Sequence, residues 1–102
     1  MKLIYIASPY TKGDVVINVR RQIDTGDRIL GMGHIPYVPN LTHFWHFVSP
    51  KAYEIWMDID SEILKRCDAV LRLSGESKGA DREVELAKSL GIPVYYSLED
   101  IT

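Results

Sequence analysis

Four short apolar runs alternate along the chain with longer segments of helical character, and this alternation constrains the fold most strongly. The runs are KLIYIAS, HIPYVP, DAVLRLS and IPVYYS, at residues 2–8, 34–39, 68–74 and 92–97. Runs of this length that are rich in β-branched and aromatic residues are typical of strands buried on both faces. Such strands occur in parallel sheets that helices cover.

The intervening segments predict helices over about 14–30, about 50–67 and 79–91, and a loop with aromatic side chains over 40–50. Strands that alternate with helices form a parallel sheet with right-handed crossovers. We therefore expect an α/β fold of three layers: a Rossmann- or flavodoxin-like open parallel sheet of four to five strands, with helices on both faces. A single domain over residues 1–102 is expected. Ligands of such sheets bind at the carboxyl ends of the strands.

The composition limits the functional class. A net charge of -2 argues against a protein that grips a nucleic-acid polymer, although it allows a single nucleotide as ligand. The one cysteine, Cys67, has no partner for an internal disulfide and is expected to be a small buried apolar residue. No apolar run approaches the ~20 residues of a membrane helix, and no signal peptide opens the chain. We therefore expect a cytoplasmic protein without a membrane partner.

Two acids lie on the apolar side of their predicted helices. Glu83 falls in the middle of the apolar arc of residues 79–91, and Asp60 does the same in residues 51–67. Burying an unpaired carboxylate costs several kcal/mol or forces it to take up a proton. Because the two helices flank the same end of the predicted sheet, we interpret both acids as functional residues.

Structural roles for these acids remain open at this point. Glu83 lies near the start of its helix, where free N–H groups favour an anion, and Asp60 is placed to bond a backbone amide or to pair with Arg20. A functional pair of carboxyls suits chemistry at an acetal-like carbon, with one acid ionised and the other protonated. We expect Glu83 to be the ionised acid and Asp60 to be the proton donor or a hydrogen-bond partner of the substrate.

Four segments, which span nearly the whole chain, carry a family resemblance. They are YIASPYT, GHIPYVP, WMDID with CDAVLRL, and SKGADRE with GIPV, in this order. Together they resemble the nucleoside 2-deoxyribosyltransferase-like superfamily, which includes the 2′-deoxynucleoside 5′-monophosphate N-glycosidases, and most closely a short branch from bacteria and phages. The resemblance implies cleavage of an N-glycosidic bond through a covalent glycosyl–Glu intermediate, whose sugar passes to water or to another nucleobase. It implies no metal and no redox cofactor.

The resemblance also assigns roles to residues. Glu83 matches the nucleophile, Asp60 the acid near the nucleobase and sugar, and Tyr5 the strand tyrosine beside the nucleophile. Substrate contacts are expected in the turn before the last helix and in the loop after the first strand, where SPY resembles the Gly-Pro-Phe/Tyr turn of the transferases: Ser77, Gly79, Ser8, Pro9 and Tyr10. That loop lacks the Ser-x-Arg-Gly-Gly pattern of the monophosphate hydrolases, so a phosphate site there and an ordinary solvated turn are both open.

The aromatic segment 40–50 suggests a wall or lid. His43 and His46 have no third ligand nearby in the sequence, so we interpret them as wall or lid residues and expect no metal site. Trp56 and the aromatic residues of this segment suit stacking on a nucleobase, packing in the core or contact between subunits. A small domain with this much aromatic surface is expected to form a homodimer or a larger homo-oligomer.

We therefore expect an enzyme that cleaves a 2′-deoxynucleoside or its 5′-monophosphate, with Glu83 attacking C1′, Asp60 serving the leaving base and Tyr5 orienting Glu83. Three alternatives remain: a nucleotide sensor without turnover, a glycohydrolase of NAD-type dinucleotides, and an interaction protein with a relic site.

Overall fold

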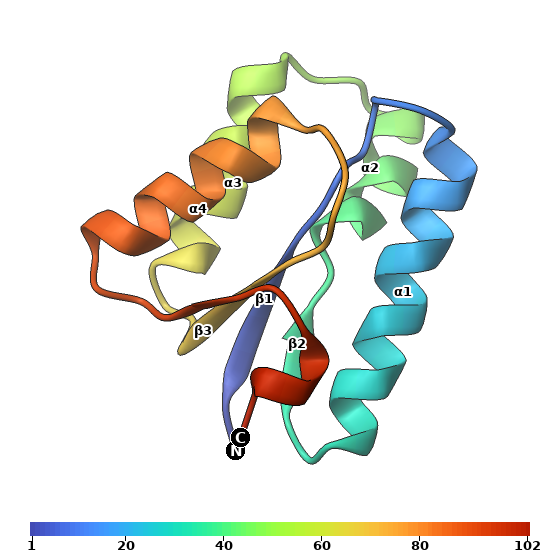
Figure 1. Ribbon diagram of the computed structural model, residues 1–102. Helices are drawn as coiled ribbons and strands as arrows, with labels where there is room; N and C mark the ends of the chain where they lie inside the picture. Colours follow the sequence, from blue (N-terminus) through green and yellow to red (C-terminus); the bar gives the residue numbers. More distant parts are fainter.

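A parallel sheet of four strands forms the centre of the fold in the computed structural model, which describes residues 1–102 (Figure 1). The strands lie in the order β2-β1-β3-β4, and every neighbouring pair is parallel. Their bounds are Leu3–Ala7 for β1, Ile35–Tyr37 for β2, Ala69–Arg72 for β3 and Val94–Tyr95 for β4. The helices are α1 (Val15–Gly31), α2 (Thr42–Val48), α3 (Tyr53–Leu64) and α4 (Lys78–Ser89), with short 3-10 turns at Pro39–Leu41 and Leu98–Asp100.

Helices cover the sheet on both faces, and the alternation of β1 shows why. Tyr5 and Ala7 face a core formed with α3 and α4, while Ile4 and Ile6 face a core that includes Ile29 of α1. Both faces of β1 are therefore apolar, as the continuous apolar run predicted. The expected three-layer α/β fold, with its flavodoxin-like parallel sheet, is confirmed.

Side-chain caps mark the starts of α1 and α4, and a glycine marks the end of α1. Asp14 accepts a hydrogen bond from the N–H of Ile17 at 3.1 Å at the start of α1, and Ser77 accepts one from the N–H of Ala80 at 3.1 Å at the start of α4. Gly33, with φ of +86°, follows α1 directly after its final turn. Both helices therefore begin at the carboxyl edge of the sheet, and the loops that precede them lie at that edge.

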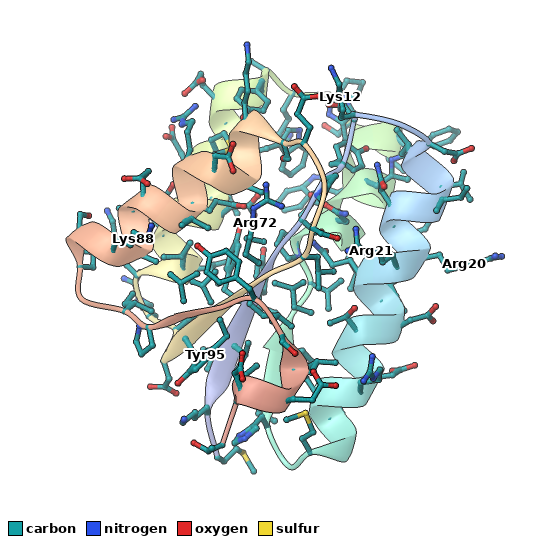
Figure 2. The ribbon with its side chains drawn as sticks, viewed as in Figure 1. Lys12, Arg20, Arg21, Arg72, Lys88 and Tyr95 are labelled. Atoms are coloured by element: carbon teal, nitrogen blue, oxygen red, sulfur yellow. The ribbon has the colours of Figure 1, made fainter.

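Several expected boundaries are wrong. Residues 40–50 do not form a loop, because a 3-10 turn leads straight into α2, a helix with no buried residue and no side-chain cap that would mark it. The helix expected from residue 50 to 67 is shorter, over Tyr53–Leu64, and the last strand has only two residues. Arg20 is exposed, and Figure 2 shows it directed away from the sheet, so it does not pair with Asp60.

The order of the strands creates a switch point between β1 and β3. The chain leaves β1 toward β2 on one side and later returns to β3 on the other, so the crossovers that follow β1 and β3 open away from each other. In open parallel sheets, ligands bind in the crevice at such a point. Figure 1 shows both chain ends at the opposite edge of the sheet. None of the helices combines the length and the apolar character that crossing a membrane requires.

Candidate active site

A cleft of about 740 Å³ lies at the carboxyl edge of the sheet. Its floor comes from the end of β1, one wall from α3 and the start of α4, and another from the loop after β1 and from α2. Its lining includes both acids singled out from the sequence, and polar or aromatic residues from each wall: Asp60, Glu83, Ser8, Tyr10, Gln22, Asn40, His43, His46, Trp56, Ser77, Gly79 and Arg82.

Glu83 lies on the buried face of α4, and its side chain is held by Tyr5 of β1. Only 7% of the residue is exposed. The hydroxyl of Tyr5, which is fully buried behind the cleft, donates a short hydrogen bond to Oε2 of Glu83. Oε1 makes no hydrogen bond with the protein. Every fully buried polar side-chain atom of the structure has a hydrogen-bond partner, so Oε1 is not fully buried and is open to the cleft. Glu83 therefore combines burial with one oxygen that a ligand can reach.

Asp60 occupies the equivalent place on α3. It is 8% exposed, and its Oδ1 accepts a hydrogen bond from the hydroxyl of Tyr37 at 3.3 Å. Oδ2 has no protein partner and is open to the cleft for the same reason as Oε1 of Glu83. Each acid thus has one oxygen held by a tyrosine of the sheet and one oxygen left free.

On balance the surroundings of both acids disfavour the charged form, including that of Glu83, which was expected to be the ionised acid. Burial raises the pKa of the Glu83 carboxyl to about 8, an effect that the hydroxyl of Tyr5 partly offsets and the nearby Asp60 increases. Burial also raises the pKa of Asp60, to about 6. Glu83 lies more than one turn beyond Lys78, where α4 begins, so the free N–H groups of the helix start do not stabilise its charge.

A neutral hydrogen-bond network builds the floor of the cleft. The side chain of Gln22, which is 1% exposed, donates to the carbonyl of Ile6 at 3.0 Å and to Oγ of Ser8 at 2.7 Å. Its oxygen accepts from the N–H of Asn40 at 2.6 Å, and Asn40 donates to the carbonyl of Pro9 at 3.3 Å. This network ties the ends of β1 and β2 to α1, so the loops that carry Ser8 and Asn40 are fixed.

Arg72, at the end of β3, organises the loop that leads to α4. It donates to the carbonyl of Leu73 and, at 2.9 Å, to that of Gly75, and it pairs with Asp81 at 3.0 Å. Figure 2 shows its side chain beside α4 and shows Arg21 reaching from α1 toward the same loop. Arg21 donates to the carbonyl of Ser74 at 2.7 Å. The two arginines hold the turn before α4 from both sides of the sheet.

The structure brings six of the seven predicted substrate-binding residues to the cleft: Ser8, Tyr10, Ser77, Gly79, Trp56 and His43. Pro9 does not line it. Pro9 is buried and packs against Gly75, where an added Cβ would lie only 2.8 Å from the proline ring. Gly79 allows a similarly close approach, since a Cβ there would lie 3.1 Å from the hydroxyl oxygen of Tyr53.

An aromatic wall joins α2 to its neighbours. The hydroxyl of Tyr10 and Nδ1 of His43, which both line the cleft, share a hydrogen bond of 2.5 Å. Trp56 donates from Nε1 to Nδ1 of His46 at 2.8 Å, and its ring packs edge-on against Trp45, with the ring centres 5.2 Å apart. Both histidines lie in the lining of the cleft. No group of three or more His, Cys, Asp and Glu side chains is arranged to hold a metal ion.

Sequence reasoning missed three residues of this site. Tyr37 is a lone tyrosine in a three-residue strand, and nothing in its sequence context distinguishes it from a core residue. Gln22 had a signal that could have been found: it lies between Val19 and Ile29 on the buried stripe of α1 at helical spacing. Arg72 ends an apolar strand, a position that is typical of ligand-binding or loop-organising residues in parallel sheets.

Comparisons with known proteins agree with this architecture. A family model described as a domain of unknown function (DUF7768) matches residues 2–97. A solved structure of a 2-deoxyribosyltransferase from the psychrotolerant bacterium Bacillus psychrosaccharolyticus is similar, with a TM-score of 0.68 at 19% sequence identity, over 98% of this chain and 77% of that chain. A likeness at this identity is one of fold. A search of the curated proteins gives no match.

Proposed function

We propose that this chain, which belongs to the DUF7768 family, cleaves the N-glycosidic bond of a 2′-deoxynucleoside or its 5′-monophosphate. The observation that carries the proposal is the pair of acids in one cleft, Glu83 and Asp60, each buried, each held at one oxygen by a tyrosine and open at the other. The fold that the chain shares with a 2-deoxyribosyltransferase supports the same kind of reaction. The short bacterial and phage branch of that superfamily is the group to which we assign the chain.

The reaction divides into two displacements at C1′ of the sugar. Oε1 of ionised Glu83 attacks C1′, the bond from C1′ to the base nitrogen breaks, and the departing nitrogen keeps the electron pair and takes the proton from Oδ2 of Asp60. The sugar is then an ester of Glu83. A water, or a second nucleobase, attacks C1′ and gives its proton to Asp60, and Glu83 leaves as a carboxylate.

The pair has to hold one proton for the first displacement. Because the pKa of Asp60 is raised to about 6 and that of Glu83 to about 8, one proton is shared by the pair between these pH values. The first displacement uses the form of the pair in which Asp60 holds this proton and Glu83 is ionised. We therefore expect a bell-shaped dependence of kcat/KM on pH, with its maximum near neutrality.

The test is release of free base, followed by chromatography. The purified protein is incubated with a panel of 2′-deoxynucleosides, their 5′-monophosphates and the matching ribonucleosides and NAD, with and without an acceptor base. Glu83→Gln is the inactive comparison, and Glu85→Gln on the exposed side of the same helix is the matched control. Release that is lost only in Glu83→Gln supports the proposal. Saturable binding without release from any substrate would instead favour a nucleotide sensor, and release from NAD would favour a glycohydrolase of dinucleotides.

We also propose that the protein is cytoplasmic and self-associates through α2. This helix buries none of its residues, and Phe44, Trp45, Phe47 and Val48 are between 51% and 82% exposed. Apolar area of this kind is typical of an interface. Phe47→Asp with Val48→Asp changes two residues that do not line the cleft, and it should convert a dimer to a monomer in light scattering. A wild-type protein that is monomeric at high concentration would contradict the proposal.

A further inference from the structure

Tyr5 and Tyr37 form a matched pair on adjacent strands. Their Cα atoms are direct partners in the register of β1 and β2, so their side chains leave the sheet on the same face, toward α3 and α4. The two rings lie with their centres 5.4 Å apart and their planes tilted by 33°. The strand register therefore fixes the spacing of the two hydroxyls.

Each hydroxyl binds a different acid of the cleft. Tyr5 donates to Oε2 of Glu83, and Tyr37 donates to Oδ1 of Asp60. No other side chain bonds either carboxyl. Packing in the core explains why both rings are buried. It does not explain why each hydroxyl is hydrogen-bonded to a different buried acid.

We propose that Tyr37 is the positioning residue of Asp60, so that the register of β1 and β2 holds the two acids apart with one phenol for each. The inference deepens the proposed function and rests on it. Because Tyr37 donates to Oδ1, the acidic proton of Asp60 is confined to Oδ2, the oxygen that is open to the cleft. In the same way Tyr5 occupies Oε2 of Glu83 and leaves Oε1 as the attacking atom.

The groups that face the two acids set the direction of the expected change. They are Tyr5 of β1, Tyr37 of β2, Arg72 of β3 and Arg82 of α4, and the acids also face each other. Cys67, just after α3, faces Tyr37. A hydroxyl that donates to a carboxylate favours the charged form and lowers its pKa. Removing the hydroxyl of Tyr37 therefore raises the pKa of Asp60, and removing that of Tyr5 raises the pKa of Glu83.

The test compares Tyr37→Phe with Tyr5→Phe and with Tyr95→Phe. Tyr95 is a half-buried tyrosine of β4 that lies with the core on the α1 side, and its hydroxyl makes no hydrogen bond with the protein, so Tyr95→Phe is the matched control. The side-chain carboxyl carbons are titrated by carbon-13 NMR, with Asp60→Asn and Glu83→Gln assigning the two signals. The pH profile of kcat/KM is measured on the same samples with the best substrate of the base-release panel.

In Tyr37→Phe we expect the pKa of Asp60 to rise by roughly one unit and the acid limb of the profile to move with it. kcat should fall by about tenfold to a hundredfold with little change in KM, because the acid is displaced while the substrate contacts remain. Tyr5→Phe should move the alkaline limb instead, and Tyr95→Phe should move neither.

The inference and the proposed function fail separately. An Asp60 signal that titrates alike in Tyr37→Phe and Tyr95→Phe would overturn the role of Tyr37, even in an active enzyme. A shifted Asp60 signal in a protein that releases no base would retain the positioning contact and remove the proposed reaction. A rate loss in Tyr37→Phe with an unchanged acid limb of the pH profile would also overturn the role of Tyr37, because a general loss of structure lowers the rate in the same way.

Discussion

Buried polar side chains lie on both sides of the sheet, but they make more hydrogen bonds on one side than on the other. On the side of α1, Gln22 uses its amide to make three hydrogen bonds, two of them to backbone groups and one to Ser8. On the side of α3 and α4, Asp60 and Glu83 are nearly as buried, but each makes a single hydrogen bond through its carboxyl, to a tyrosine. All three residues line the same cleft.

This difference separates a side chain that stabilises the fold from side chains that are available for chemistry. A buried amide whose bonds are all made stabilises the loops that it joins and has nothing left for a ligand. A buried acid with a free oxygen destabilises the fold when it ionises, and in return it offers an atom that a substrate can contact. Substitutions on the two sides should therefore change stability in opposite directions.

Glu83→Gln should show the largest effect. Burial raises the pKa of Glu83 in the folded protein to about 8, above its ordinary value of 4.5. The fold therefore has its full stability below pH 4.5 and loses part of it as the pH rises to 8. Glutamine stays neutral, so it should add on the order of 5 kcal/mol to the free energy of unfolding at pH 9 and almost nothing at pH 4. Base release should fall by a factor of about a thousand or more.

Urea unfolding at the two pH values measures this change, with Glu85→Gln on the exposed side of α4 as control. If Glu83→Gln were less stable than the wild type at pH 9, the Glu83 carboxylate would stabilise the fold. The acids would then not differ from Gln22 on the other side of the sheet.

Gln22→Leu should act in the opposite direction. Leucine removes the donor to the carbonyl of Ile6 and the acceptor for the N–H of Asn40, and it leaves both backbone groups buried without their partner. We expect a loss of about 3 kcal/mol in the free energy of unfolding. No titratable group is changed, so the loss should be the same at pH 4 and pH 9. A loss that grows with pH would show that Gln22 is coupled to the acids across the sheet.

Asp60→Asn sharpens the comparison on the acid side. Burial raises the pKa of Asp60 to about 6 from 3.8, a smaller rise than that of Glu83. The stabilising effect of Asp60→Asn should therefore be smaller, on the order of 3 kcal/mol, and complete by pH 7 rather than pH 9. Thermal unfolding scanned from pH 4 to pH 9 resolves the two windows. Identical windows for Asp60→Asn and Glu83→Gln would show that the acids titrate as one group.

The sequence predicted the acids because helical periodicity reports which face of a helix is buried. Glu83 and Asp60 interrupt apolar arcs, and a charge in such a place is conspicuous. The upward shift of both pKa values could not be predicted in this way. It depends on how deeply each carboxyl is buried and on where α4 begins, and both are set by tertiary packing.

Residues whose role depends on a strand neighbour escaped prediction for a related reason. Tyr37 matters because the register pairs it with Tyr5, and the register is a property of two strands that lie far apart in the sequence. The helix α2 escaped because it buries no residue and has no capping side chain, so neither periodicity nor boundary residues mark it. The fold was predictable from apolar runs, whereas the contacts between elements were not.

Two helix caps give the smallest and most specific comparison. Ser77 and Asp14 make the same bond, each accepting from a backbone N–H at 3.1 Å, but only Ser77 lines the cleft. Replacing either by alanine should cost about 1 kcal/mol in the free energy of unfolding, because each removes one cap. Only Ser77→Ala should also raise KM, by a few-fold, because it removes a hydroxyl from the lining of the cleft in which we propose that the substrate binds. Denaturant unfolding and steady-state kinetics on both variants separate the shared effect from the local one. Equal changes in KM would mean that the start of α4 affects the substrate through stability alone, and Ser77 would then belong with Gln22 as scaffold.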